Sequence, residues 1–283
     1  MKRALNRFFW AILIVAVAGY GGLLWWFGEH QSELVYQPER GSRLIPDSLG
    51  LFPQEVNVTS ADGTLLVGRI YRGMRPDSTA TWVLYFHGNA GNASARFMFH
   101  AQLVRLGASV LVAEYRGYGP SSGSPDESGL YKDADAFYAY ARTTLGIPPG
   151  RLVIYGHSLG SGVAIDLASR VPAAGLIVEG AFTSVVDRGQ ELYPYLPVAW
   201  LATNRFDSLE KIPRVRMSKL FIHAIDDRVI PIAHGRRLFD AAAPPKFFLE
   251  VRGGHDFAYS VDRHIFLTGL GAFLERARRP DQF

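Results

Sequence analysis

The chain has 283 residues, 48% of them hydrophobic and 20% charged, which is enough apolar material for one sizeable α/β domain. Cysteine is absent, which excludes disulfides, thiolate catalysis and cysteine-ligated metal sites. The formal net charge of +4 comes largely from Lys and Arg near the two ends, and no basic stripe with interleaved aromatics lies between them. We therefore expect no nucleic-acid partner.

The chain opens with an uncharged apolar stretch, residues 8–27, with aromatic residues at both ends. A helix over this stretch would be about 30 Å long, close to the thickness of one hydrocarbon core. Three basic residues precede it and two glutamates follow it. This asymmetry predicts a single-pass anchor with a cytoplasmic N-terminus and a periplasmic or otherwise extracytoplasmic domain.

The alternative for this segment is a cleaved signal peptide, because Ala16-Val17-Ala18 has the A-x-A form. A cleavage site is usually followed by polar residues, whereas the apolar run continues to Phe27. An uncleaved membrane anchor over residues 1–27 is the favoured interpretation. Residues 28–52, rich in Pro, Gly, Ser and charges, are expected to be a linker.

A domain over residues 53–283 follows, and it starts with a β-hairpin over 54–60 and 64–71, where apolar and polar residues alternate around Asp62-Gly63. A compact apolar strand at 81–86 leads into the loop His87-Gly88-Asn89-Ala90-Gly91-Asn92. The next expected elements are a helix over 93–106, a strand over 109–114 and a helix over 127–145.

Residues 152–160 predict a nucleophile elbow. The apolar strand Leu152–Tyr155 runs directly into Gly156-His157-Ser158-Leu159-Gly160, and a helical pattern follows. When a strand, a G-x-S-x-G motif and a helix follow one another in this order, the glycines allow a sharp turn that exposes the serine hydroxyl. A second G-x-S-x-G, at residues 119–123, lies in a loop well past its strand, and Pro125 follows before any helix, so it is expected to be a turn.

The remaining chain alternates strands and helices with one interruption. Strands are expected at 175–179, 219–223 and 246–251, and helices at 233–242 and 261–277. Residues 181–206 break the alternation, are rich in aromatics and are expected to form a small cap over the site. The alternation predicts an α/β fold with a mostly parallel sheet and helices on both faces.

Titratable residues follow two of the late strands, at the sheet edge where such sites gather. His255 comes after the strand ending at residue 251, and Asp226 and Asp227 come after the strand ending at residue 223. The order Ser158, Asp, His is that of an α/β-hydrolase triad, in which His255 takes the serine proton and the carboxylate orients the imidazole. Spacing alone leaves the choice between Asp226 and Asp227 open.

An oxyanion intermediate needs hydrogen-bond donors, and the expected ones are two backbone N–H groups. One belongs to Leu159, the residue after the nucleophile, and the other to Asn89, in the loop after an early strand. The sequence contains no H-E-x-x-H, Walker A or G-x-G-x-x-G motif. We therefore expect neither a metal nor a cofactor.

Six motifs in order then resemble the Bem46-like, membrane-anchored α/β-hydrolases: FHGNAGN (86–92), YRGYGPSSGSP (115–125), YGHSLGSGVA (155–164), FDSLEKIP (206–213), IHAIDDRVIP (222–231) and GGHDF (253–257). The resemblance covers roughly residues 50–275. It implies Asp227 as the acid, supports Ser158, His255 and the two N–H donors, and differs at Ala224, where Gly is usual.

The expected function is a serine hydrolase that cleaves acyl esters or thioesters through an acyl-enzyme, with a small-molecule or lipid substrate. Two alternatives remain: a peptidase or amidase using the same triad, and a non-catalytic, membrane-tethered binding protein that keeps the fold.

Overall fold

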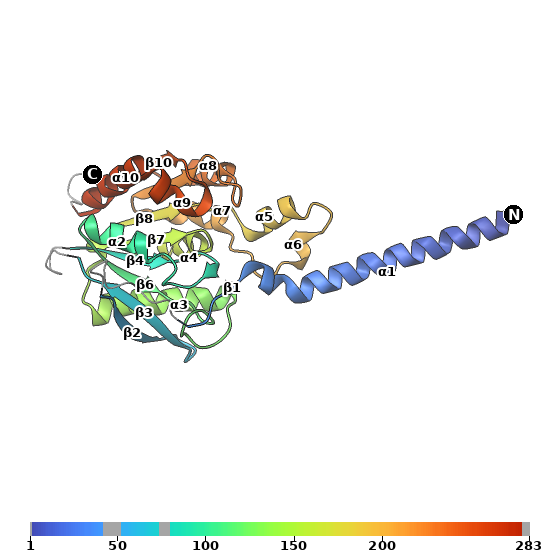
Figure 1. The fold of residues 1–283 in the computed structure, drawn as a ribbon, viewed down its shortest axis with the longest axis horizontal. Helices are drawn as coiled ribbons and strands as arrows, with labels where there is room; N and C mark the ends of the chain where they lie inside the picture. Colours follow the sequence, from blue (N-terminus) through green and yellow to red (C-terminus); the bar gives the residue numbers. More distant parts are fainter. Residues whose placement is uncertain (1, 42–51, 74–79, 279–283) are drawn as a thin grey trace.

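The computed structural model describes residues 2–41, 52–73 and 80–278. These residues build an eight-stranded sheet in the order β10-β9-β8-β7-β4-β6-β3-β2 (Figure 1). Pairing is parallel from β6 to β10, and only β2 and β3 at one edge run antiparallel to their neighbours. The predicted α/β fold is confirmed. The strands are β2 (Gln54–Thr59), β3 (Leu65–Tyr71), β4 (Thr81–Phe86), β6 (Ala108–Ala113), β7 (Leu152–His157), β8 (Gly175–Glu179), β9 (Lys219–Ala224) and β10 (Lys246–Val251).

Helices cover both faces of the sheet, which explains why the central strands read as unbroken apolar runs. Successive side chains of a strand point to opposite faces, and in β4 Leu84 enters one hydrophobic core while Tyr85 enters the other. Helices α3 and α4 contribute to the first core, and α2 and α10 to the second. The helices in the body are α2 (Phe97–Arg105), α3 (Glu127–Ala139), α4 (Leu159–Ala168), α5 (Val185–Leu192), α6 (Val198–Leu201), α7 (Ser208–Lys211), α8 (Ile232–Ala241), α9 (Gly254–Val261) and α10 (Arg263–Arg278).

Three of the predicted helices differ from those observed. The helix expected over 93–106 is α2, which begins at Phe97 after a turn over residues 93–96. The helix expected over 127–145 ends as α-helix at Ala139 and continues as one π-helical turn, Tyr140–Thr144. The closing helix expected over 261–277 is α10, and a separate helix, α9, precedes it. Strand β10 is therefore followed by a short turn and α9, not by a long loop.

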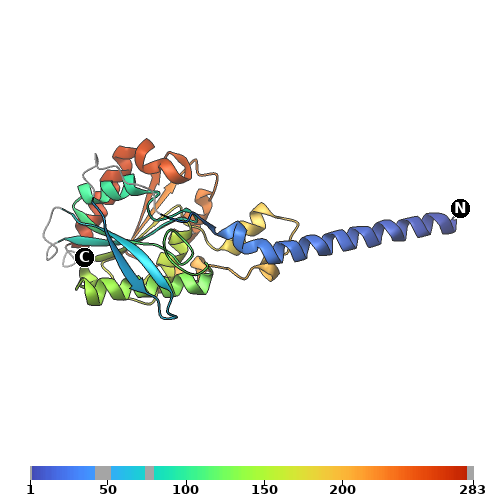
Figure 2. The same cartoon turned by 60° about the horizontal axis from the view of Figure 1, so that its bottom comes forward.

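The N-terminal helix α1 (Lys2–Val35) is longer than predicted and projects away from the body (Figures 1 and 2). It runs eight residues into the expected linker, so the linker does not start at residue 28; residues 42–51 of that linker lie outside the described residues. After α1, strand β1 (Gln37–Pro38) pairs in parallel with β5 (Ala90–Gly91), in the loop after β4. The chain after α1 therefore leads directly to the end of the sheet.

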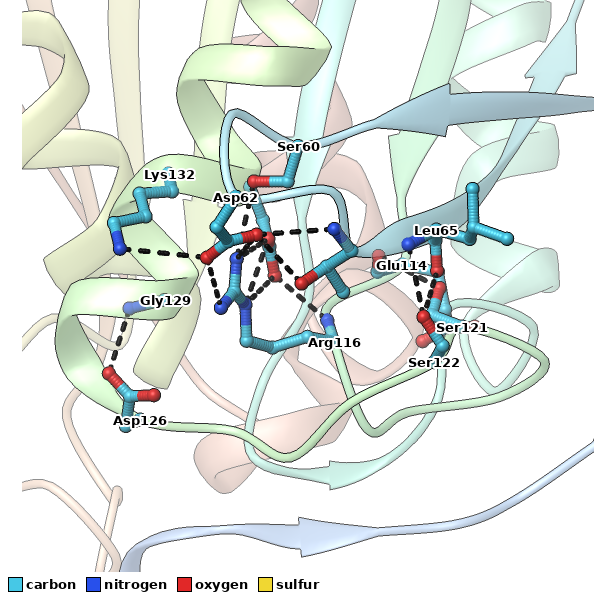
Figure 3. A network of polar contacts seen from close by, with 12 residues as sticks. Ser60, Asp62, Leu65, Glu114, Arg116, Ser121, Ser122, Asp126, Gly129 and Lys132 are labelled. Atoms are coloured by element: carbon cyan, nitrogen blue, oxygen red, sulfur yellow. Dashed lines mark hydrogen bonds and ion pairs between the residues drawn. The ribbon is translucent and has the colours of Figure 1, made fainter.

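A buried ion pair ties the hairpin to the helical layer (Figure 3). The Arg116 guanidinium, in the loop after β6, lies 2.8 Å from a carboxylate oxygen of Asp133 on α3 and 2.9 Å from one of Asp62 in the β2–β3 turn. In the same loop, the Ser121 hydroxyl accepts a hydrogen bond from the Val67 N–H at 3.0 Å. The second G-x-S-x-G therefore lies in a structural turn packed against the hairpin, as predicted.

Candidate active site

Ser158 lies between the end of β7 and the start of α4 with φ 53° and ψ −121°, a conformation that L-residues rarely adopt. Its surroundings hold this conformation. The Ser158 N–H donates to the Glu179 carbonyl at 2.9 Å, and the Ser161 N–H donates to the Ser158 carbonyl at 2.8 Å. The predicted strand, sharp turn and helix are all present.

Two glycines make this turn possible because the backbone packs too closely for a side chain. A Cβ at Gly156 would lie 2.2 Å from the Gly160 carbonyl oxygen in α4. A Cβ at Gly160 would lie 2.2 Å from the Phe86 carbonyl oxygen at the end of β4. The motif therefore brings the elbow helix against the strand that leads to Asn89.

Three predicted side chains meet at the carboxyl edge of the sheet. His255 Nε2 lies 2.8 Å from Ser158 Oγ, and His255 Nδ1 lies 2.7 Å from Asp227 Oδ2. The other Asp227 oxygen accepts the N–H groups of Val229 and Ile230, both at 2.8 Å. His255 lies in the first turn of α9, close behind β10. The fold thus links residues far apart in the chain by one continuous series of hydrogen bonds.

The environment of Asp227 favours the ionised carboxylate. Burial raises its pKa, but the hydrogen bond and charge of His255, together with the Ile230 N–H, outweigh burial and leave the pKa below its ordinary value. An ionised acceptor here would hold the proton of His255 on Nδ1, which leaves Nε2 free to accept the Ser158 hydroxyl proton.

Asp226, the other carboxylate considered from the sequence, has a different position. Its side chain accepts the N–H of Gly253 at 3.1 Å and the N–H of Gly254 at 3.0 Å, so it braces the turn before α9. No hydrogen bond or ion pair joins it to the His255 ring, and Asp226 is exposed. The structure thus brings Asp227, and not Asp226, to the histidine.

The residues of the two predicted N–H donors lie at the same cavity as Ser158. Asn89 and Leu159 both line it. The Asn89 loop is held in place by α1 and β1: its side-chain amide donates to the Val35 carbonyl at 3.2 Å, and its own carbonyl accepts the Gln37 N–H at 3.2 Å. Sequence reasoning did not foresee this support from the N-terminal segment.

A cavity of about 350 Å³ adjoins Ser158. Most of its walls are apolar, and they come from the elbow, the cap and, unexpectedly, the last turns of α1. The cavity is thus an apolar compartment that ends at the serine hydroxyl. Its lining includes Phe27, Gln31, Leu34, Val35, Asn89, Leu159, Phe182, Val185, Leu192, Tyr193, Val198 and Ile230.

A buried ionic group beneath the elbow was missed from the sequence. Glu179, the last residue of β8, accepts the Tyr155 hydroxyl at 2.7 Å and pairs with Arg96 at 3.0 Å. Its backbone carbonyl also receives the Ser158 N–H. A charged residue that ends an otherwise apolar buried strand is the sequence signal that would have indicated it.

One group of possible metal ligands occurs among the described residues: ring nitrogens of His157 and His255 and a carboxylate oxygen of Asp256 lie within 4.8 Å of one another. Both ring nitrogens of His255 are already hydrogen-bonded, to Ser158 and Asp227. The arrangement fits a histidine that serves as a base better than one that serves as a ligand.

Comparison with known proteins identifies relatives of this fold. Residues 77–210 match a family model described as serine aminopeptidase, S33. An uncharacterized protein of Mycobacterium tuberculosis (strain ATCC 25618 / H37Rv) is 34% identical over 266 residues, which are 93% of each chain. Lysophosphatidylserine lipase ABHD12 of Danio rerio is 37% identical over 184 residues, which are 58% of this chain and 48% of the lipase.

A plant relative and a solved structure agree with these matches. The alpha/beta hydrolase domain-containing protein WAV2 of Arabidopsis thaliana is 28% identical over 248 residues, covering 79% of this chain and 80% of WAV2. The structure of Pyrococcus furiosus esterase Pf2001 superposes with a TM-score of 0.72 at 17% identity, covering 86% of this chain and 98% of the esterase chain. With its fold, its motifs and these relatives, the chain belongs to the Bem46-like α/β-hydrolases and is a hydrolase.

Proposed function

We propose that this hydrolase cleaves acyl esters or thioesters, with Ser158 as nucleophile, His255 as general base and acid, and Asp227 as the group that orients the imidazole. The observation that carries the proposal is the hydrogen-bonded series Ser158–His255–Asp227, with separations of 2.8 Å and 2.7 Å, at the end of an apolar cavity. A serine is a poor nucleophile at its free pKa, and an adjacent base activates it.

In the first step, Ser158 Oγ forms a bond to the acyl carbon while its proton passes to His255 Nε2. The resulting oxyanion accepts hydrogen bonds from the backbone N–H groups of Asn89 and Leu159. The carbon–oxygen or carbon–sulfur bond then breaks, and the alcohol or thiol leaves with the proton from His255. Water, deprotonated by the same imidazole, attacks the acyl-enzyme and releases the acid and free Ser158.

The substrate proposed is a small molecule or lipid that carries an acyl chain. The cavity next to Ser158 is walled mainly by apolar side chains, which suit an acyl group. One relative, from Danio rerio, is named a lysophosphatidylserine lipase, a hydrolase of an acyl-bearing lipid.

The test of the nucleophile is Ser158→Ala in the full-length chain. We expect it to abolish both labelling by a fluorophosphonate probe and hydrolysis of a p-nitrophenyl ester, because among the described residues Ser158 carries the one hydroxyl that is hydrogen-bonded to His255. Ser121→Ala, in the second G-x-S-x-G, is the matched control and should retain labelling. Undiminished labelling of the Ser158 variant would remove Ser158 from the mechanism.

An amidase or peptidase is the second candidate, favoured by the description of the matching family model as a serine aminopeptidase. The same three residues would serve, with an amine as leaving group. Values of kcat/KM for an ester and an amide of the same acyl group separate the two. A higher value for the amide would replace the esterase proposal.

We also propose that α1 anchors the chain in a membrane, with the N-terminus cytoplasmic and the catalytic domain on the extracytoplasmic side. Among the described residues, α1 is the one helix long and apolar enough to cross a membrane. The basic residues before it support this direction. In spheroplasts of a bacterial expression host, added protease should cleave the domain while leaving an N-terminal tag intact, and protection of the domain would reverse the topology.

A further inference from the structure

One face of α1 contacts the cap. The Tyr20 hydroxyl donates to the Tyr195 carbonyl at 2.8 Å, and the Phe27 ring meets the Tyr193 ring edge-on with centroids 5.4 Å apart. Further along, Gln31 is buried and donates to the Leu201 carbonyl at 3.0 Å. Tyr20, Phe27 and Gln31 are seven and four residues apart, and side chains at these spacings lie on one face of a helix.

These contacts place the cap beside the apolar part of α1. Tyr20 precedes Phe27, the end of the predicted span, by seven residues, or about 10 Å along a helix. The segment around Tyr195 therefore lies alongside the last turns of the span. Figures 1 and 2 agree that α5 and α6 flank this end of α1.

The cap turns aromatic side chains outward at this level. Tyr195 is 86% exposed and Trp200 is 90% exposed. The segment from residue 192 to residue 204 contains no charged residue. Trp and Tyr are enriched where membrane proteins meet the interface between lipid and water, because their rings are partly apolar and partly polar. An uncharged segment with exposed Trp and Tyr beside an apolar helix therefore has the composition of a segment at that interface.

The cavity next to Ser158 joins this region to the catalytic groups. Phe27, Gln31 and Leu34 of α1 form part of its wall, and residues of α5 and α6 form the facing part. The anchor helix is therefore also a wall of the cavity that ends at the serine hydroxyl.

We propose that the cap segment 192–201, here called the cap tip, inserts into the extracytoplasmic leaflet beside α1, and that the acyl substrate passes laterally from that leaflet between α1 and the cap to Ser158. The occupant of this surface is a lipid bilayer, because the surface is continuous with a helix that has the length and composition of a membrane span. The route of the substrate rests on the proposed serine hydrolase function, whereas the insertion of the cap tip does not.

The insertion is tested by site-specific fluorescence, since the chain has no cysteine and a single Cys gives a unique labelling position. Tyr195→Cys and Trp200→Cys, each labelled with the NBD fluorophore, are reconstituted in phosphatidylcholine vesicles. We expect a blue-shifted emission and quenching by doxyl-labelled phosphatidylcholine. The control is Ala272→Cys, an exposed position on α10. Figure 1 shows that α10 lies on the side of the body away from the projecting part of α1.

Quenching at both cap positions and not at residue 272 supports insertion. Emission and quenching at residues 195 and 200 equal to those at residue 272 would overturn it. Retained fluorophosphonate labelling of Ser158 in each variant shows that the site is folded.

The route is tested by Leu34→Trp, which enlarges a side chain that lines the cavity while being 38% exposed. The control is Glu33→Trp, at a neighbouring exposed position that does not line the cavity. The measured quantity is kcat/KM for a vesicle-embedded dodecanoyl ester divided by kcat/KM for a soluble acetate ester. We expect this ratio to fall roughly tenfold or more in Leu34→Trp, because the pocket loses room for methylene groups. Glu33→Trp should keep the wild-type ratio. An unchanged ratio at residue 34 would overturn the route, whereas a wild type inert to both esters and probe would overturn the hydrolase function itself and leave the fluorescence result standing.

Discussion

Asp226 and Asp227 are adjacent carboxylates with separate tasks. Asp227 Oδ2 lies 2.7 Å from His255 Nδ1, whereas the Asp226 side chain accepts two backbone N–H groups before α9. The difference arises because consecutive residues in a turn point in different directions. Spacing in the sequence therefore left the choice open, family resemblance favoured Asp227, and the tertiary hydrogen bonds distinguish the two positions.

The pair also supplies a matched experiment. Asp227→Asn should lower kcat by about 10⁴, because an amide facing Nδ1 favours the wrong imidazole tautomer. Asp226→Asn keeps an acceptor oxygen for the Gly253 and Gly254 N–H groups, so kcat should fall by less than about tenfold. The measurement is kcat with a p-nitrophenyl ester. A larger loss at Asp226 than at Asp227 would contradict the assignment.

Glu179 shows the kind of residue that sequence reasoning misses. Its apolar strand was predicted with the observed bounds, yet nothing nearby in the sequence indicates its partners, Arg96 and Tyr155. Both partners come from other elements, and the pairing exists only after the strands align. A buried charge needs such partners, so the position of Glu179 is a tertiary property.

At the scale of elements, the elbow depends on the contact between α4 and the end of β4. Gly160→Ala would place a methyl group 2.2 Å from the Phe86 carbonyl oxygen and 2.6 Å from the His87 carbonyl oxygen. Backbone would have to move, so we expect a loss of about 1–3 kcal/mol in the free energy of unfolding. Activity should also fall because the displaced strand end carries the Asn89 loop.

The control is Gly150→Ala, where an added Cβ meets nothing within 4 Å. Urea denaturation in detergent micelles and kcat/KM measure the two effects. A Gly160 variant as stable and active as the Gly150 variant would show that the close approach is not needed.

The ends of several elements were less predictable than their existence. Strand β10 was predicted correctly, but the helix that carries His255 was not. α9 and α10 are separated at Asp262, whose side chain accepts the Arg252 N–H at 3.1 Å. This hydrogen bond joins the junction between the two helices to the chain after β10, and the helical periodicity of the sequence does not indicate such a contact.

At the scale of the whole molecule, buried histidines make folding stability depend on pH. His100, His157 and His223 are buried, and desolvation lowers the pKa of each. They remain neutral in the folded chain but take up protons in the unfolded chain below pH about 6.5. Their contribution to stability is therefore complete above that pH and is lost as pH falls through it.

His100→Phe tests this dependence, because neither ring nitrogen of His100 has a hydrogen-bond partner within the described residues and the ring packs against Tyr71 and Tyr85. Between pH 6 and pH 5, the free energy of unfolding of the wild type should fall more steeply than that of the variant, by up to about 1.4 kcal/mol per pH unit. The same substitution at solvent-exposed His264 is the control. Equal slopes for wild type and His100→Phe would contradict the prediction.

Features that depend on local chemistry could be predicted from the sequence. The two glycines predicted the elbow at residues 156–160, and the spacing of apolar residues predicted the sheet strands and the long apolar helix. Both signals depend on residues that are neighbours in the chain. The tertiary structure alone shows what supports the Asn89 loop and that α1 lines the cavity, and its hydrogen bonds agree with the family resemblance in bringing Asp227 to His255. Those features depend on contacts between residues distant in sequence, and the energy of such contacts exists only after the elements pack.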